Sequence, residues 1–224
     1  VAEPALINWS VKSESSSSFI SAQKSTPAVK DGIIFHGAED RTFRATQSKT
    51  GVGLWSYKCG RSTAGKSILS AAAINDQTVH FGSYDGRIHA LDIETGSPRW
   101  VKLLCDTIGS SPVTAPEINK LFIGLEFSGQ GNKGGLAAIS LDTGEVMWKF
   151  ELSAYTHATP LYIKEHQQVL IGGNEGVLYS FDANTGELQW KFETIGGSLY
   201  VGGGFGSGDI KLAPVFDQDT DNVG

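Results

Sequence analysis

Short hydrophobic runs separated by turn residues fill most of the chain. One apolar run ends at Ile74, Asn75 and Asp76 form a turn, and a second run, residues 78–82, follows directly. Runs of roughly 4 to 6 residues that are rich in Val, Ile, Thr and aromatic side chains are typical of β-strands. Four such runs occur in each period of the pattern, which predicts a four-stranded antiparallel meander.

The meander occurs four times in register. If Ala90 is aligned with Ala45, Ala138 and Ser180, a Thr-Gly pair and a tryptophan fall into the same columns of every copy, and the copies are 45, 48 and 42 residues apart. The aligned residues are Thr50-Gly51, Thr95-Gly96, Thr143-Gly144 and Thr185-Gly186, followed by Trp55, Trp100, Trp148 and Trp190. Trp9 fits the same column 46 residues before Trp55, so all five tryptophans share one position of the repeat.

A repeat of this length with four strands is the sequence signature of a β-propeller blade. Because a single blade leaves both faces of its sheet uncovered, neighbouring blades must stack around an axis. We therefore expect one all-β propeller domain over residues 1–224, with four complete blades near 25–59, 67–104, 110–152 and 157–194. Residues 1–12 fit the last strand of a preceding blade, and residues 211–224 fit the first strands of a following one.

The repeated glycines and tryptophans have an expected structural role. Each glycine supplies the positive φ of the tight turn between the third and fourth strands. Each tryptophan follows four residues later on the outer strand, where its ring can pack against the next blade and its N–H can donate. We therefore expect these residues to dock the blades rather than to bind a ligand: Gly51, Gly96, Gly144, Gly186, Trp9, Trp55, Trp100, Trp148 and Trp190.

These motifs resemble those of a known family. Ala90-Leu91-Asp92-x-x-Thr95-Gly96-x-x-x-Trp100 and the matching segment from Ser180 to Trp190 look like the tryptophan-docking motif of PQQ-type, quinoprotein-like β-propeller repeats. The upstream segment 82–86 fits the Gly-x-x-Asp/Glu-Gly part of the same pattern, and 173–176 carries its Glu-Gly end; the resemblance covers nearly the whole chain. The first repeat departs from it, with Arg41 for the second glycine and Gln47 for the aspartate. WD40 repeats match less well, because no Trp-Asp dipeptide occurs.

The number of repeats bears on how the ring closes. Propellers of the resembled family usually have about seven or eight blades. Four complete blades with partial blades at both ends do not close such a ring, and an open ring would expose two apolar blade faces. We therefore expect the chain to be a segment of a longer protein, or to complete its propeller with another chain.

Composition and charge exclude several classes of protein. With 40% hydrophobic and 19% charged residues, the chain has the composition of a folded domain. The net charge is −6, and the Lys and Arg residues are scattered, which argues against a nucleic-acid partner. No apolar run is long enough for a membrane-spanning helix. The two cysteines, Cys59 and Cys105, follow tryptophans of adjacent repeats; a disulfide is conceivable, but two free thiols are the favoured interpretation.

No catalytic or metal-binding residue is expected in this chain. The five histidines show no paired spacing of a zinc site, so we expect structural or surface roles for them. The segment 217–221 begins like a calcium loop, but Asn222 stands where that loop needs glycine, and a turn is the favoured interpretation. Gly-x-Ser-x-Gly is absent. No cofactor is therefore expected; the family resemblance implies PQQ with calcium only if the chain is part of a dehydrogenase.

The places where the repeats differ are the candidate binding elements. The third repeat has an insertion of about six residues between its second and third strands, and a long glycine-rich link follows the fourth repeat. In an up-and-down blade both segments emerge on the same rim. The candidate binding residues are Phe127, Gln130, Asn132, Lys133, Tyr200 and Phe205. Drift of a surface loop is the alternative explanation of both differences.

The preferred functional hypothesis is a non-catalytic scaffold that binds a protein or small-molecule partner on this rim. Its expected location is extracytoplasmic, either periplasmic or secreted. The first alternative is a segment of a PQQ-dependent quinoprotein dehydrogenase, and the second is a sensor domain of a larger signalling or enzymatic protein. A fold of this kind does not by itself decide among them.

Overall fold

Four antiparallel sheets of four strands each make up the computed structural model of this protein, which describes residues 9–10, 25–62, 68–194, 214, 216–217 and 222–223. The first sheet contains β1 (Ala28–Lys30), β2 (Ile33–Gly37), β3 (Thr42–Gln47) and β4 (Gly53–Lys58). The second contains β5 (Ala73–Asn75), β6 (Thr78–Gly82), β7 (Arg87–Asp92) and β8 (Pro98–Leu103). We call these sheets blades 1 and 2.

Blades 3 and 4 follow with the same order of strands. Blade 3 contains β9 (Val113–Ala115), β10 (Lys120–Phe127), β11 (Lys133–Ser140) and β12 (Val146–Leu152), with 3₁₀ turns η1 (Pro116–Ile118) and η2 (Ser128–Gln130). Blade 4 contains β13 (Leu161–Ile163), β14 (Gln168–Gly172), β15 (Val177–Asp182) and β16 (Leu188–Glu193). A short hairpin of β17 (Phe216–Asp217) and β18 (Asn222–Val223) comes after them. The all-β expectation is confirmed.

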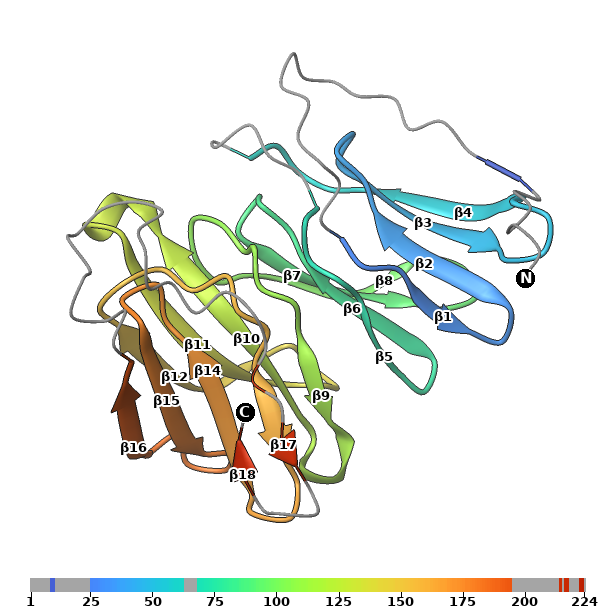
Figure 1. Cartoon of the computed structure of the whole chain (residues 1–224). Coiled ribbons are helices and arrows are strands. Elements are labelled where there is room, and N and C mark those ends of the chain that lie inside the picture. The colour runs from blue at the N-terminus through green and yellow to red at the C-terminus, as the bar shows by residue number, and fades with distance from the viewer. Residues whose placement is uncertain are drawn as a thin grey trace, which may run out of the picture.

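The blades stand side by side in chain order, from the blue sheet β1–β4 to the orange sheet β13–β16 (Figure 1). Their first strands touch in series, since β1 contacts β5, β5 contacts β9 and β9 contacts β13. Every strand pairs antiparallel with the next strand of its own blade. This is the arrangement of propeller blades, with the first strand of each blade innermost and the fourth outermost.

The hydrophobic core lies between the blades rather than within one of them. The residues that bury their side chains between blades 1 and 2 include Phe35 and Phe43 of the first and Val79, Phe81 and Leu91 of the second. The Phe43 and Phe81 rings stack with centroids 3.9 Å apart. Equivalent clusters fill the interfaces of blades 2 with 3 and 3 with 4. Each blade is therefore stabilised mainly by its neighbours.

Each described interface contains a tryptophan seated on the turn of the next blade. The indole N–H groups donate to the backbone carbonyls of that turn, over 2.8 to 3.1 Å: Trp9 to Ser48, Trp55 to Ile93, Trp100 to Leu141 and Trp148 to Ala183. The same turns carry the repeated glycines with φ between 70° and 77°. A Cβ added to Gly144 would lie 2.6 Å from the Trp100 ring, and the other three glycines meet their tryptophans as closely. At each of these positions a tryptophan side chain therefore contacts bare backbone of the next blade.

The last tryptophan has a different environment. Trp190 on β16 is 38% exposed, and its neighbours Leu188 and Phe192 are 42% and 62% exposed. In contrast, Trp148 at the same position of blade 3 is packed against Phe122 and Phe181. The docking role of the five tryptophans and four glycines stays a prediction that substitutions test.

The first repeat keeps the turn of the other blades although it lacks their glycine. Arg41 stands where blades 2 and 4 have Gly86 and Gly176, and it adopts the same left-handed conformation, with φ of 66° against 79° and 78°. The amide of Arg41 donates to Ala38 O, as the amide of Gly86 donates to Ser83 O. The turn is therefore kept at the expense of backbone strain at a non-glycine residue.

Both cysteines are free thiols. Burial raises the pKa of Cys59 and of Cys105 to about 12, so both are protonated at neutral pH. Among the described residues, no helix is long and apolar enough to cross a membrane.

Candidate functional site

The candidate binding rim consists of the connections that follow the second and fourth strands of each blade. Its tallest element is the β10–β11 hairpin, since each of these strands has eight residues, against five or six in their counterparts β6 and β7. The sequence places the insertion of blade 3 in a loop from 126 to 133. The structure instead pairs Phe127 with Lys133 and Glu126 with Gly134, so most of the insertion lengthens the strands.

The hairpin is held to β12 and to the connections on both sides of blade 3. Tyr155 donates its hydroxyl to Asn132 Oδ1 over 2.7 Å, and the amide of Gly129 donates to Asp106 Oδ2 over 3.0 Å. Lys133 forms an ion pair with Glu151 of β12. Asn132 closes the turn in the left-handed conformation, with φ of 65°. These contacts tie the hairpin to its surroundings on both sides of its tip.

The candidate residues of this rim differ in accessibility. Phe127 is 9% exposed, and Lys149 Nζ lies 4.2 Å from the centre of its ring, so Phe127 supports the hairpin from beneath. Asn132 and Lys133 are half-buried, whereas Ser128 and Gly129 at the tip are exposed. Gln130 belongs to η2, but its side chain lies outside the described part. Tyr200 and Phe205 also lie outside the described residues.

Buried carboxylates hold the blade connections together on the same rim. Asp85 Oδ2 accepts the amide of Gly60 over 2.9 Å, and Glu126 Oε1 accepts that of Gly109 over 2.8 Å. In blade 4, Glu175 Oε1 accepts the hydroxyl of Ser153 over 3.0 Å. The three carboxylates are 5% to 8% exposed. Each one therefore binds the connection that enters its blade.

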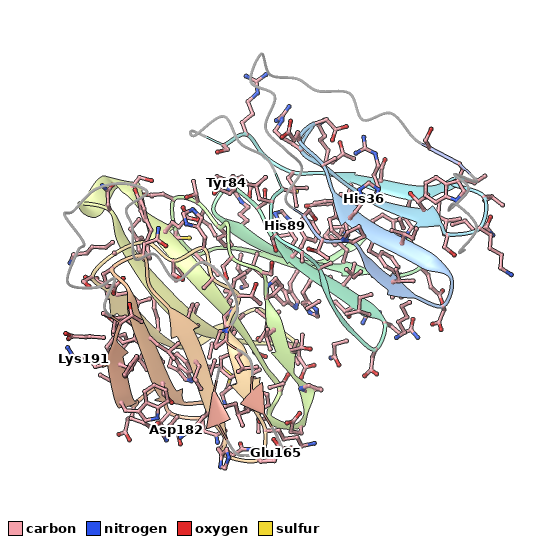
Figure 2. The ribbon with its side chains drawn as sticks, in the orientation of Figure 1. His36, Tyr84, His89, Glu165, Asp182 and Lys191 are labelled. Carbon is pink, nitrogen blue, oxygen red and sulfur yellow. The ribbon has the colours of Figure 1, made fainter. Side chains whose placement is uncertain are left out.

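In three blades the carboxylate also meets a side chain four residues later on the third strand. Asp85 Oδ1 lies 3.6 Å from His89 Nε2, and Glu175 Oε1 accepts the Tyr179 hydroxyl over 2.6 Å. Burial acts to raise the pKa of Asp85, but His89 and the amides of Gly60 and Arg87 lower it overall. His89 itself is buried, stacked 4.9 Å from the Phe81 ring (Figure 2). This environment favours the structural role that the sequence predicts for it.

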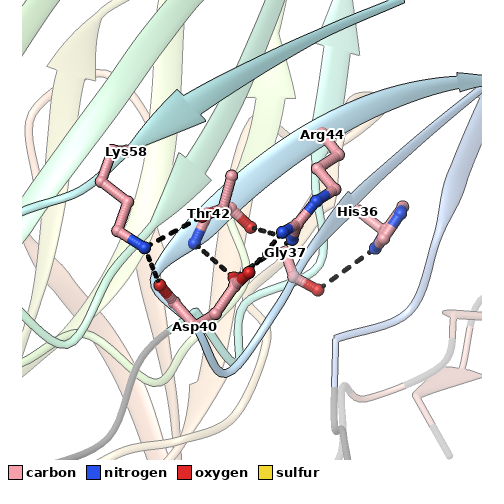
Figure 3. Close-up of polar contacts among 6 residues, drawn as sticks. All are labelled: His36, Gly37, Asp40, Thr42, Arg44 and Lys58. Carbon is pink, nitrogen blue, oxygen red and sulfur yellow. Dashed lines mark hydrogen bonds and ion pairs between the residues drawn. The ribbon is translucent and has the colours of Figure 1, made fainter. Parts of the chain in front are cut away.

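Blade 1 shows the most extensive version of this arrangement (Figure 3). Asp40 pairs with Arg44, and its Oδ1 accepts the amide of Thr42 over 2.9 Å. Lys58 donates to Asp40 O and, over 3.3 Å, to Thr42 Oγ1. Burial acts against ionisation of Asp40, but the bonds from Arg44 and Thr42 lower its pKa overall. His36 Nδ1 lies 3.4 Å from Gly37 O beside this network.

Blade 3 departs from this pattern, because its insertion alters the residues that come after the carboxylate. Glu126 Oε2 accepts the hydroxyl of Thr107 over 3.2 Å and lies 3.4 Å from Nε2 of His157, which comes from the connection to blade 4. Gly109 lies at the centre of this group, since a Cβ there would be 2.8 Å from Glu126, His157 and Tyr84. A carboxylate beside an imidazole can exchange a proton. Here the carboxylate accepts hydrogen bonds from Thr107 and Gly109 of the connection between blades 2 and 3. This arrangement favours a structural role for Glu126 in joining the blades.

Sequence reasoning missed the Glu126–His157 pair. The two residues are far apart in the sequence, and no spacing pattern links them. For blades 2 and 4 the sequence does contain a signal, the acidic residue of the Gly-x-x-Asp/Glu-Gly motif. This residue is Asp85 or Glu175, which binds the connection that enters its blade.

Within residues 25–62 and 68–194, no three His, Cys, Asp or Glu side chains come together as a group that could hold a metal ion. The calcium-like segment 217–221 is mostly outside the described part. Phe216 pairs with Val223 and Asp217 with Asn222, so the segment joins the two strands of a hairpin.

The repeat, the blade topology and the tryptophan contacts define a β-propeller protein of PQQ-type repeats. Residues 3–123 and 106–207 match the model of the family described as outer membrane protein assembly factor BamB. The chain belongs to this family.

Sequence relatives include several alcohol dehydrogenases. The quinohemoprotein alcohol dehydrogenase of Comamonas testosteroni is 31% identical over 137 residues, which are 57% of this chain and 19% of the relative. The dehydrogenase subunit of the quinone alcohol dehydrogenase of Gluconacetobacter polyoxogenes is 30% identical over 145 residues, again 57% of this chain and 19% of the relative. The chain thus spans about a fifth of the length of these curated relatives.

Solved structures show the same fold at low identity. BamB from Moraxella catarrhalis superposes with a TM-score of 0.61 at 19% identity, over 78% of this chain and 54% of that one. A europium-containing methanol dehydrogenase superposes with a TM-score of 0.71 at 17% identity, over 88% of this chain and 50% of that one. These likenesses confirm the propeller fold.

Proposed function

We propose that this chain is a non-catalytic binding scaffold that presents the tip of the β10–β11 hairpin to a partner protein. The observation that carries the proposal is the anchoring of this hairpin by Tyr155, Asp106 and Glu151. A binding element that is rigid before contact loses less conformational entropy on association. Ser128, Gly129 and Gly131 are exposed at the tip, with Asn132 and Lys133 beside them.

The chemistry of the rim supports the same proposal. The buried carboxylates that a catalytic site would use are committed to the amides and hydroxyls of the blade connections. The family to which the chain belongs is described as an outer membrane protein assembly factor. On that ground we propose an extracytoplasmic location, periplasmic or secreted.

Site-specific photocrosslinking tests the scaffold. A photoreactive residue is placed at Ser128 on the tip, and in a matched control at Glu94, which is exposed in the β7–β8 turn on the opposite rim. We expect cells of the source organism to yield a discrete crosslinked protein from position 128 and none from position 94. Shortening the hairpin to the length of the β6–β7 turn should abolish binding of that protein. Equal labelling from both positions, or none from 128, would disprove the proposal.

The second candidate function is a segment of a PQQ-dependent quinoprotein dehydrogenase. The observation in its favour is the set of relatives that are 30% to 31% identical over more than half of this chain. The described residues do not themselves fit a PQQ and calcium site, because Asp85, Glu126 and Glu175 already bind neighbouring connections. Under this candidate the cofactor ligands would lie elsewhere in the complete protein.

Reconstitution separates the two candidates. The full-length protein is incubated with PQQ and calcium, and the oxidation of alcohols or sugars is followed with a redox dye. The scaffold predicts no cofactor-dependent oxidation, whereas the dehydrogenase predicts turnover that requires both PQQ and calcium. A sensor domain attached to a larger protein is a third alternative, and it predicts that ligand binding changes the activity of the attached module.

A further inference from the structure

A pocket of about 180 Å³ opens between blades 2 and 3, on the rim opposite the β10–β11 hairpin. It is bounded by the β5–β6 turn at Asn75 and Asp76, by His80 on β6, by Trp100 on β8 and by the β11–β12 turn at Asp142. In Figure 1, blade 2 (β5–β8) stands next to blade 3 (β9–β12). The pocket has room for several waters.

The pocket lies where one ring of the repeat has been exchanged. His80 is 5.6 Å from the Trp100 ring, tilted by 45°. The equivalent pairs are Phe35 with Trp55, at 5.9 Å and 43°, and Phe122 with Trp148, at 5.8 Å and 40°. Blade 2 therefore places an imidazole in a position that its neighbours fill with phenylalanine. An imidazole is smaller than a phenyl ring and brings two polar atoms into an apolar interface.

The buried imidazole lacks the partners that its burial requires. His80 is 1% exposed, and neither Nδ1 nor Nε2 makes a hydrogen bond of acceptable geometry. Burial lowers its pKa to about 4, an effect that the backbone of Ala73 only partly offsets, so the ring is neutral at pH 7. A neutral imidazole has one N–H to donate and one lone pair to accept with. A buried polar group without a partner is unfavourable. Both nitrogens are closed to solvent in this structure, so a ligand in the adjoining pocket can supply the missing partner only when the ring turns towards the pocket.

The charges at the pocket restrict the kind of ligand. Arg99 at its edge is held by Asp92, over 2.8 Å, and is not available as a free cation. Asp142 Oδ2 accepts from Asn119 over 2.9 Å, and Asp76 contributes a second carboxylate. The two carboxylates favour groups that donate hydrogen bonds. The Trp100 ring adds an apolar wall.

We propose that this pocket is a binding site for a small polyhydroxylated molecule, a polyol or a monosaccharide. A hydroxyl both donates and accepts, so it can pair with whichever nitrogen of His80 the ring turns towards the pocket. Further hydroxyls donate to Asp76 and Asp142, and the C–H face of the molecule packs on Trp100. The site lies on the other rim from the hairpin, so the proposal stands independently of the scaffold function.

Titration of the protein with D-glucose and myo-inositol tests the proposal. Polyols stabilise proteins generally by exclusion from their surface, so a rise in melting temperature does not suffice. The readout is the long-range ¹H–¹⁵N NMR spectrum of the histidine rings, together with saturation transfer to the probe. We expect a saturable shift of one imidazole at pH 7. No saturable shift up to about 50 mM of either probe, far above a millimolar Kd, would overturn the proposal.

Three variants locate the site. His80→Phe restores the ring found at Phe35 and Phe122, and it should fold and weaken binding at least tenfold. His36→Phe replaces a histidine of blade 1 by phenylalanine at a position not equivalent to His80, and it should leave binding unchanged. Asp142→Asn keeps His80 in place and removes one carboxylate, so it should weaken binding at least threefold. Undiminished binding by His80→Phe or by Asp142→Asn would contradict the assignment.

Discussion

At the scale of single residues, the glycine of each Thr-Gly turn meets two requirements at once. Gly144 has φ of 70°, a conformation that disfavours side chains, and it leaves room for the face of the Trp100 ring. Neither requirement alone excludes every other residue, since Arg41 adopts φ of 66° elsewhere in the chain. The close approach of the indole is what excludes a Cβ here.

We therefore expect Gly144→Ala to lower the free energy of unfolding by about 2 to 5 kcal/mol. This range adds about 1 to 2 kcal/mol for the left-handed conformation to about 1 to 3 kcal/mol for overpacking against the ring. Urea unfolding followed by circular dichroism measures it. Gly53→Ala is the matched control, because a Cβ at Gly53 meets nothing within 4 Å. Equal effects of the two changes would show that the tryptophan contact does not matter.

The buried histidine predicts a pH dependence of stability. The pKa of His80 is about 4 in the folded protein, against about 6.5 in the unfolded chain. Between these values the unfolded chain binds the proton more strongly, so the contribution is complete above pH 6.5 and is lost as the pH falls towards 4. Relative to His80→Phe, the wild type should lose up to about 3 kcal/mol over this interval, at about 1.4 kcal/mol per pH unit.

Urea titrations of both proteins at pH 7, 6, 5 and 4 measure this difference. Other groups titrate in the same range, among them His36, whose pKa burial also lowers. Because both proteins contain those groups, the difference between them isolates His80. A difference that stays constant with pH would contradict neutral burial of the imidazole.

At the scale of elements, the β10–β11 hairpin shows where sequence reasoning reaches its limit. The strands, turns and tryptophan register of the four blades followed from the repeat, because one pattern occurs four times. The insertion of blade 3 occurs once, and its glycines at 129, 131, 134 and 135 indicated a loop. The structure continues β10 to Phe127 and begins β11 at Lys133, because a cross-strand partner satisfies backbone groups that a loop would leave to water.

The same limit applies to the polar contacts between blades. The aligned sequence shows that His80 occupies the position of Phe35 in blade 1 and Phe122 in blade 3. The pocket beside it cannot, since it requires the positions of Trp100 and Asp142 in two different blades. The pairing of Glu126 with His157 likewise requires the folded structure, because it joins β10 to the connection between blades 3 and 4.

A single hydroxyl should control the order of the hairpin tip. Tyr155→Phe removes the bond from the Tyr155 hydroxyl to Asn132 and leaves the ring in place. The loss of about 1 kcal/mol should speed hydrogen exchange in the tip, residues 128–133, by about fivefold. Hydrogen-exchange mass spectrometry measures it. Tyr162→Phe is the control, because its hydroxyl contacts Gln167 in another turn; an equal change in the tip there would refute the role of Tyr155.

At the scale of the whole molecule, stability is distributed along a row of interfaces. A blade with a neighbour on each face gains burial twice, as repeat proteins do. Blade 3 contributes to two buried clusters, with Leu121 and Ile123 facing one way and Phe122 and Leu136 the other. The outer strand β16 of blade 4, in contrast, has every residue exposed.

Hydrogen exchange across the molecule should follow this distribution. We expect the slowest amides in β6, β7, β10 and β11, whose residues are almost entirely buried. Exchange in β16 should be faster than in β12, the equivalent strand of blade 3, which keeps Leu152 buried. Mass spectrometry of proteolytic fragments compares the two strands directly. Slower exchange in β16 than in β12 would contradict a stability set by neighbouring blades.

The contact of Trp55, Trp100 and Trp148 with the turn of the following blade also has a consequence for how the number of repeats can evolve. Every blade carries both halves of the contact, a tryptophan for its successor and a glycine turn for its predecessor. Duplication or loss of one whole repeat in the gene therefore leaves each remaining tryptophan facing a glycine. At this contact, a change of blade number therefore needs no compensating substitution.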